Sequence, residues 1–451
     1  MHLNASTEYS QTLLQSRTDK QFQEGRITPA LSTIQKGLSH QVTDTVMVMD
    51  ISKAKEIVVE AGKQLVSSGL IARTWGNVSC RIDDKTFVIT PSGRAYETLT
   101  PDEIVLVNMD DLSYEGDIKP SSEKGIHAQC YLLRPECNFV IHTHQSNASI
   151  VSVLGCDINN IEGYSRDIIG DNVPLAAYGL PGTGKLREGV VNALKRSDSK
   201  AVIMKHHGAV CLGADYDEAF KIASELEAVC EKFVFEKYTA LTSKKAESFA
   251  DIRAYVEDLK KRADAPAPKL TAYDSSREGN IVVLKEKDGT EKATVGLADK
   301  YLILGEWPEE LDMHCAIYNK RKDVKYIIQS EDEDIVTASK ITKVLNPLLD
   351  DFAQIAGVTV RSAVYNPNDT LKSSKKVVKA LGKHRTAALL KDNGAVCVGS
   401  SKDEAEAAEM VTAKDCKSYV SSRMFTTAKN IGKIDAALMN LIYRIKYSKQ
   451  K

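Results

Sequence analysis

The sequence has almost no excess of charge of either sign. Its 60 Lys and Arg residues balance 61 Asp and Glu residues, which gives a formal net charge of -1. Proteins that bind nucleic acid or anionic lipid through their overall field carry a basic excess. No apolar run approaches the roughly 20 residues that cross a bilayer. We therefore predict neither a nucleic-acid partner nor a membrane partner.

Cysteine is also scarce. The chain has nine cysteines in 451 residues, and no two of them form a CxxC pair. This spacing excludes a disulfide scaffold and favours a reducing compartment. The N-terminus has neither the charged start nor the apolar core of a signal peptide. These absences together predict a cytoplasmic protein.

The length exceeds what one ordinary core accommodates, which indicates two domains. A Pro-rich segment, Ala-Asp-Ala-Pro-Ala-Pro-Lys, lies just beyond the middle of the chain and suits a linker. We predict an N-terminal tail over 1–46, a first domain over 47–262, a linker over 263–270 and a second domain over 271–451.

Periodicity predicts an α/β pattern in the first domain. The expected helices cover 51–68, 148–154, 184–195 and 216–238, and one more begins near Ser121 or Ser122 and ends by Pro135. The expected strands cover 77–80, 86–89, 104–108, 139–144, 173–176 and 201–205.

The second half repeats the first. The segment that starts at Ile126 aligns without a gap with the segment that starts at Met313, and KHHGAVCLG at Lys205 matches KDNGAVCVG at Lys391. Three histidines of the first copy are replaced in the second: His142 by Gln329, His144 by Glu331 and His207 by Asn393. We therefore predict that the second copy has lost a set of candidate ligands.

These three histidines could bind a metal ion. His142 and His144 alternate along a predicted strand and so point to one face. His207 follows the apolar run 201–204, and Gly208 after it permits close backbone approach. Three imidazoles suit Zn²⁺ or another divalent ion. The alternative is that they are ordinary core or surface histidines.

The Ser121-Ser122-Glu123 segment has two readings. One is a helix cap followed by an acid in the first turn. A capping box, however, would place Glu three residues after the capping serine, where Lys124 or Gly125 stands, so Glu123 is free for chemistry. Two serines at a helix start could also bind an anion such as phosphate, together with the Gly-bearing turns Gly76-Asn77 and Ser92-Gly93. Taken alone, the residues of each motif are explained by the need to form a turn.

The motifs, taken in order, resemble the class II aldolase/adducin family. They are Gly76-Asn77-Val78-Ser79, Thr90-Pro91-Ser92-Gly93, Pro120-Ser121-Ser122-Glu123, His142-Thr143-His144 and His207-Gly208. The resemblance covers roughly residues 51–238. It implies a three-layer α/β/α sandwich around a mainly antiparallel sheet, repeated here in a degenerate second domain, and a homo-oligomer.

The resemblance also implies roles for particular residues. His142, His144 and His207 would bind Zn²⁺, and Glu123 would be the general base. Tyr164 would be an acid that reaches a neighbouring subunit's site. The substrate phosphate would be held by Gly76, Asn77, Ser92, Gly93, Ser121 and Ser122.

The activity implied is a zinc-dependent aldolase. It would cleave a ketose 1-phosphate such as L-fuculose 1-phosphate into dihydroxyacetone phosphate and a small aldehyde, so a small phosphorylated sugar is the expected partner. Three alternatives remain: an L-ribulose-5-phosphate 4-epimerase with Asp167 as an extra acid/base, a methylthioribulose phosphate dehydratase, and a non-catalytic adducin-like binding protein. The second half suits the last of these, and we expect it to be a structural pseudo-domain in a pseudo-symmetric assembly.

Overall fold

The computed structural model describes residues 49–71, 75–260 and 265–446. The predicted tail over 1–46 lies outside these residues, as does part of the predicted linker. The domain boundaries therefore stay predictions. Among the described helices, none combines the length and the apolar character of a membrane span.

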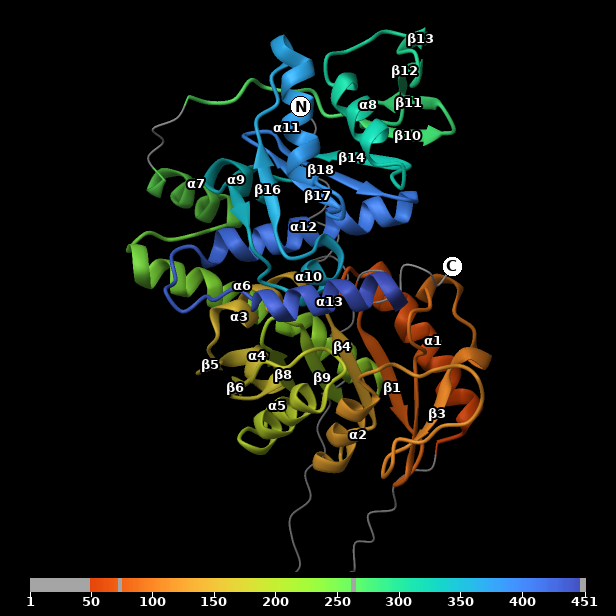
Figure 1. The fold of residues 1–451 in the computed structure, drawn as a ribbon. Helices are drawn as coiled ribbons and strands as arrows, with labels where there is room; N and C mark the ends of the chain where they lie inside the picture. Colours follow the sequence, from red (N-terminus) through yellow and green to blue (C-terminus); the bar gives the residue numbers. More distant parts are fainter. Residues whose placement is uncertain (1–48, 72–74, 261–264, 447–451) are drawn as a thin grey trace, which may run out of the picture. The chain divides into compact units, whose positions relative to one another are not determined.

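The first half forms a seven-stranded sheet in the order β3-β2-β1-β4-β9-β8-β7. Figure 1 labels its strands β1, β3, β4, β8 and β9. The pair β7–β8 is parallel and the other neighbours are antiparallel. The elements are α1 (Ile51–Ser67), β1 (Asn77–Arg81), β2 (Thr86–Ile89), β3 (Val105–Asn108), α2 (Lys124–Leu133), β4 (Phe139–Thr143), α3 (Ser146–Leu154), β5 (Ile158–Asn159), α4 (Gly163–Ile169), β6 (Asn172–Val173), β7 (Leu175–Ala176), α5 (Gly184–Lys195), β8 (Ala201–Met204), β9 (Ala209–Gly213), α6 (Tyr216–Thr242) and α7 (Phe249–Leu259).

Alternating residues of β4 separate the two faces of this sheet. Phe139 and Ile141 pack into an apolar cluster with residues of α1, α3 and α6. Val140 packs into a second cluster with residues of α2 and α5. The predicted three-layer sandwich with a mainly antiparallel sheet is therefore confirmed. His142 continues the Val140 side of the strand, because side chains alternate along a strand.

The start of α2 differs from the prediction. Glu123 occupies the N-cap position, and its side chain makes no capping hydrogen bond. The Ser121 hydroxyl instead accepts a hydrogen bond from the Glu123 amide (3.2 Å). The predicted serine cap of the helix is therefore wrong: the serine stabilises the turn before the helix and leaves the Glu123 carboxylate unused by the cap.

The second half builds a nine-stranded sheet in the order β13-β12-β11-β10-β14-β18-β17-β16-β15. Residues of α8 and α11 share an apolar cluster with one face, and residues of α9 and α12 share one with the other. The elements are β10 (Asp274–Glu278), β11 (Ile281–Lys285), β12 (Glu291–Gly296), β13 (Tyr301–Gly305), α8 (Leu311–Lys320), β14 (Tyr326–Ser330), α9 (Glu333–Ile341), β15 (Val344–Leu345), α10 (Asp350–Ala356), β16 (Val360–Ala363), α11 (Thr370–Leu381), β17 (Ala387–Leu390), β18 (Gly394–Gly399), α12 (Lys402–Ser422) and α13 (Lys433–Lys446).

The repeat extends to a buried hydrogen-bond network. In the first half, the Ser79 hydroxyl bonds the Nδ1 atom of His127 (2.6 Å) and the hydroxyl of Tyr131 (2.6 Å). In the second half, Ser275 makes the same two contacts, with His314 (2.7 Å) and Tyr318 (2.9 Å). The two halves are therefore copies of one fold at the level of individual side chains.

Both copies also share a close backbone approach. A Cβ on Gly208 would overlap the carbonyl oxygen of Thr143, and one on Gly394 would overlap that of Ser330. The absence of a side chain on Gly208 lets the turn between β8 and β9 contact the end of β4. In the same way, Gly394 lets the turn between β17 and β18 contact the end of β14. In the first half, this approach brings His207 to the end of β4.

We expect Gly394→Ala to destabilise the protein by at least about 2 kcal/mol, because it adds a backbone overlap to a left-handed φ of +95°. Gly289→Ala is the matched control: its φ is +89°, but nothing lies within 4 Å of the added carbon. It should cost about 1 kcal/mol. Denaturant unfolding followed by circular dichroism compares the two, and equal losses would show that the overlap does not matter.

Candidate metal centre

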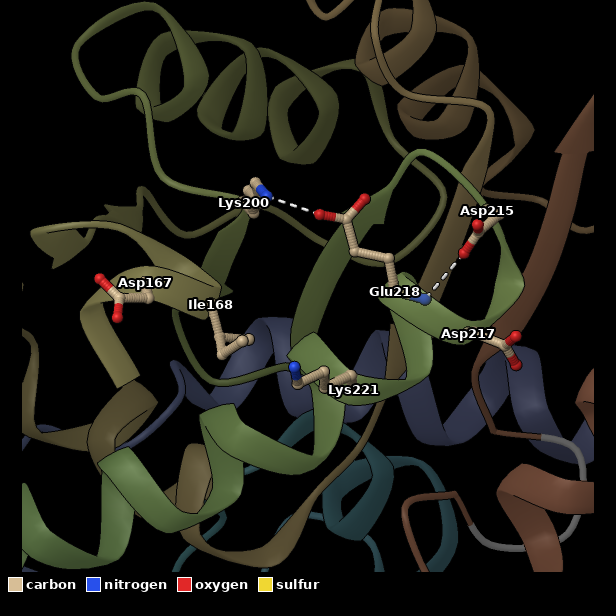
Figure 2. A pocket seen from close by; sticks show the side chains of 7 residues that line it. All are labelled: Asp167, Ile168, Lys200, Asp215, Asp217, Glu218 and Lys221. Atoms are coloured by element: carbon tan, nitrogen blue, oxygen red, sulfur yellow. Dashed lines mark hydrogen bonds and ion pairs between the residues drawn. The ribbon is translucent and has the colours of Figure 1, made fainter. Parts of the chain in front are cut away.

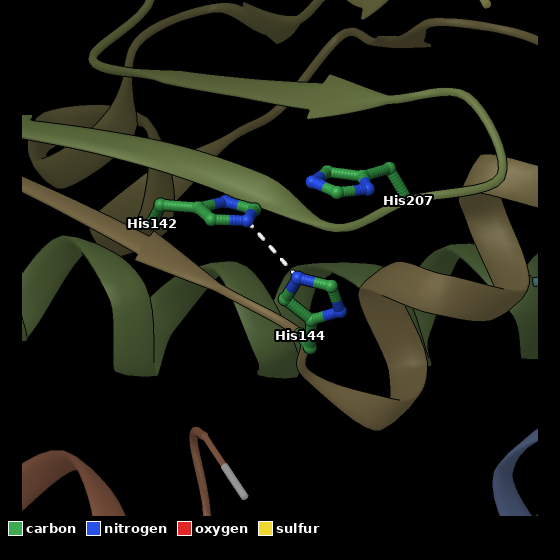
Figure 3. A group of neighbouring side chains, drawn as sticks. All are labelled: His142, His144 and His207. Carbon is green, nitrogen blue, oxygen red and sulfur yellow. Dashed lines mark hydrogen bonds between the residues drawn. The ribbon is translucent and has the colours of Figure 1, made fainter. Parts of the chain in front are cut away.

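Three buried histidines converge where β4 ends. His142 is on β4, His144 is the first residue after the end of β4, and His207 lies in the turn between β8 and β9. One nitrogen of each ring lies within 4.8 Å of the corresponding nitrogens of the other two (Figure 3). The Nε2 atoms of His142 and His144 are 3.0 Å apart. No second group of this kind occurs among the described residues.

The Nδ1 atom of each ring faces a different partner. His142 Nδ1 lies 2.9 Å from the Ala209 carbonyl oxygen, and His144 Nδ1 lies 3.6 Å from a carboxylate oxygen of Asp351. His207 Nδ1 contacts Asp350. A ring that donates Nδ1–H presents a lone pair at Nε2.

This donor set fits a divalent cation. When both rings carry their proton on Nδ1, the Nε2 lone pairs of His142 and His144 face each other at 3.0 Å, and a cation between them removes their repulsion. The buried Nε2 atom of His207 makes no hydrogen bond of good geometry among the described residues. It faces the Glu123 carboxylate at 3.0 Å, as expected of two ligand atoms around one cation. Metal-binding histidines usually have their other ring nitrogen held by a carbonyl or carboxylate, and His142 and His207 show this pattern.

Glu123 completes the cluster. Its carboxylate oxygens lie 3.3 Å from His142 Nε2 and 3.0 Å from His207 Nε2. The Asn77 amide donates to it (3.1 Å), and the Asn77 carbonyl accepts from His127 Nε2. His127 Nδ1 then accepts from Ser79, which continues the network that both copies share. The sequence indicated no role for His127, although its alignment with His314 marked the position.

Burial and charge set the protonation of the cluster. Burial lowers the pKa of His142 to about 3 and that of His144 to about 4, so both rings are neutral at pH 7. Burial alone would raise the pKa of Glu123, but His207 and His142 hold it well below its usual value. Asp350 and Glu123 outweigh burial and raise the pKa of His207.

Two of the predicted phosphate-binding turns lie side by side. A bridge between Pro91 and Pro120 joins them. The Ser92 amide donates to Lys119 (2.9 Å) and the Ser121 amide to Thr90 (3.0 Å). These two amides are used by the bridge, and the Ser121 hydroxyl accepts from the Glu123 amide. The hydroxyls of Ser92 and Ser122 lie on the same joined turns.

The other predicted phosphate residues have local partners. The carbonyl of Gly76 accepts from the Tyr96 hydroxyl (3.0 Å), and both ends of the Asn77 side chain are used by Glu123 and His127. Ser122 and Gly93 are exposed. A phosphate role for all six residues stays a prediction.

Tyr164 and Asp167 lie on α4. Tyr164 is 61% exposed, and the Lys221 ammonium lies 5.1 Å from the centre of its ring. Asp167 lines a different pocket, together with Lys221 and the ion pair Lys200–Glu218 (Figure 2). The structure thus shows neither side chain in the histidine cluster.

The equivalent place in the second half is filled by the chain itself. Asn393 accepts from the Leu270 amide (2.9 Å) and donates to the Pro268 carbonyl (2.9 Å). Gln329 donates to the Thr271 carbonyl (3.3 Å), and Glu310, the counterpart of Glu123, accepts from the Thr271 amide (3.0 Å). The residues that stand in place of the histidines therefore bind the backbone of residues 268–271, the segment that leads into this half.

Comparison with known proteins gives a family. The model described as "Class II Aldolase and Adducin N-terminal domain" matches residues 56–234 and 267–420. The chain is 35% identical over 187 residues to the 5-methylthioribulose-1-phosphate/5-deoxyribulose-1-phosphate aldolase of Escherichia coli O45:K1, a match that covers 41% of this chain and 85% of that one. It is 33% identical over 186 residues to the L-fuculose phosphate aldolase of Escherichia coli strain K12, with coverage of 41% and 85%.

A solved structure of an L-fuculose 1-phosphate aldolase is also similar, at 27% identity and a TM-score of 0.40, over 43% of this chain and 90% of that one. The relatives named as aldolases support the prediction that this chain is an enzyme with lyase activity. The two regions matched by the family agree with the repeat seen in sequence and structure. The chain therefore belongs to the class II aldolase and adducin family, as two tandem copies.

Proposed function

We propose that the first half is a zinc-dependent aldolase that cleaves a ketose 1-phosphate into dihydroxyacetone phosphate and a small aldehyde. The observation that carries the proposal is the convergence of three imidazole nitrogens and the Glu123 carboxylate in one buried cluster. Three histidine ligands leave room for a substrate, which is the arrangement of a catalytic rather than a structural zinc site.

In the proposed reaction, the three histidines hold the ion, and Glu123 is the general acid–base group. The histidines are His142, His144 and His207. The bound ion would supply a Lewis acid for the substrate's oxygens. Glu123, as the general base, takes the proton of the C4 hydroxyl, the C3–C4 bond breaks with its electron pair passing to C3, and the aldehyde leaves. Glu123 returns a proton to C3, which yields dihydroxyacetone phosphate. The hydrogen bond from Asn77 keeps this carboxylate in place.

The substrate class is supported by the names of the relatives. A 5-deoxyribulose 1-phosphate and an L-fuculose phosphate are both phosphorylated ketoses. We propose that the phosphate binds at the joined turns that carry Ser92, Gly93, Ser121 and Ser122, next to Glu123 in the chain. Tyr164 would act at the aldehyde end of a site in another copy, as its exposed position permits. Asp167, which the epimerase alternative needs, lines the pocket of Figure 2 instead.

Substitution of one ligand should remove the metal. We expect His207→Ala to lose bound zinc, because it removes one of the three imidazole nitrogens that converge in the cluster. His314→Ala is the matched control, since it removes a buried histidine of the second copy that lies outside the cluster. Elemental analysis after dialysis measures the zinc content of both. Equal zinc in His207→Ala and in the unsubstituted protein would refute the ligand assignment.

The two equivalent glutamates should differ in their effect on turnover. We expect Glu123→Gln to lower kcat for release of dihydroxyacetone phosphate by about 10²–10⁴-fold, the usual contribution of a general acid–base group. Glu310→Gln should keep kcat, because Glu310 binds the Thr271 amide of the entering segment. A panel of ketose 1-phosphates with a coupled assay gives both values. Similar losses in the two variants would contradict the assignment of Glu123.

A further inference from the structure

The first turn of α10, in the second half, lies against the metal centre of the first half. The Asp350 amide donates to the carbonyl of His206 (3.0 Å), and His206 Nδ1 contacts the carbonyl of Leu348 (2.8 Å). His206 immediately precedes His207. The turn that carries one proposed metal ligand is therefore fixed to the second half by two hydrogen bonds.

Two consecutive aspartates of α10 face two of the histidines. The Asp350 carboxylate contacts Nδ1 of His207, and Asp351 lies 3.6 Å from Nδ1 of His144. Both aspartates are buried, at 1% and 0% exposure. Lys414, on α12, pairs with Asp351 and also donates to the His144 carbonyl (3.4 Å).

The start of α10 is itself held in position. The buried carboxylate of Asp415 accepts hydrogen bonds from the amides of Leu348 and Leu349, both at 2.9 Å. Leu349 is the N-cap residue of α10. The two aspartates are thus presented by a helix end whose backbone is anchored within the second half.

The charges around the cluster support a role with the metal ion. Glu123, Asp350 and Asp351 are carboxylates, and Lys414 is the ammonium that pairs with one of them. With neutral histidine rings, these groups leave an excess of two negative charges. One oxygen of Asp350 has no hydrogen-bond partner among the described residues, which is costly for a buried carboxylate. A divalent cation among the histidines would balance this charge.

We propose that the second half completes the metal centre of the first, with Asp350 and Asp351 as positioning residues. Asp350 accepts from the Nδ1–H of His207 and turns its Nε2 toward the metal. Asp351, 3.6 Å from Nδ1 of His144, would orient that ring through its charge. This inference rests on the proposed function. It gives the degenerate copy a direct part in the site, beyond packing.

The test is zinc affinity in the full-length protein, by competition with a chelating dye. Loss of a carboxylate that holds a ligand typically weakens metal binding by 10–100-fold, and we expect Asp350→Ala to fall in this range. Asp350→Asn keeps an acceptor but loses the charge, so its loss should be smaller. The d–d absorption spectrum of the Co²⁺-loaded protein should change in Asp350→Ala, because His207 is no longer held.

Glu257→Gln is the matched control. Glu257 on α7 pairs with Lys340 on α9 (2.9 Å) and so also joins the two halves, but it touches no histidine of the cluster. It should bind zinc as the unsubstituted protein does. Thermal unfolding in excess chelator shows whether each variant folds. If Asp350→Ala does not fold, the zinc affinity of Asp350→Asn tests the inference instead.

The outcomes separate this inference from the proposed function. Zinc affinity and a cobalt spectrum unchanged in both Asp350 variants would overturn the inference and leave the proposed function standing. An affinity loss as large in Glu257→Gln as in Asp350→Ala would also overturn it, since any weakened contact between the halves would then suffice. An unsubstituted protein that binds neither zinc nor cobalt would overturn both.

Discussion

The balance of charge at one buried point is the constraint on which the site depends. Lone pairs of His142, His144 and His207 face one another there, beside the Glu123 carboxylate. Each polar group buried without a partner costs about 1–3 kcal/mol, so the cluster requires a cation, either a proton or a metal ion. The β4 strand supplies two of the rings by its alternation. The third arrives only because Gly208 lets its turn contact the end of β4.

The second copy shows that the scaffold does not need this charge. Its Ser–His–Tyr network and its glycine contact are retained. At the ligand positions, however, Gln329 and Asn393 bind backbone groups of the segment that enters the domain. Amide side chains carry both a donor and an acceptor, so they can satisfy such backbone groups without a cation. Glu310 remains, and its carboxylate accepts from the Thr271 amide of the same segment.

Most of the fold and part of the site could be predicted from local sequence. Periodicity located the principal strands and helices, and the spacing of His142 and His144 placed them on one face. The partners of these histidines could not be found in this way. Asp350 and Asp351 lie in another domain copy, and no local pattern connects them with His207. The role of His127 depends on the pairing of β1 with β4, which sets Asn77 opposite His142.

The repeat also explains how α10 reaches this site. The ungapped alignment that begins at Ile126 and Met313 continues to α4 and α10, where Gly163 falls on Asp350 and Tyr164 on Asp351. The resemblance assigns Tyr164 to a neighbouring subunit's site, and in this chain the corresponding helix of the second half approaches the first half's histidines. In the proposed arrangement, the second half would take the place of a neighbouring subunit, with Asp351 at the position where the first copy has Tyr164. The proposed positioning role would then account for a copy whose own ligand positions carry Gln329, Glu331 and Asn393.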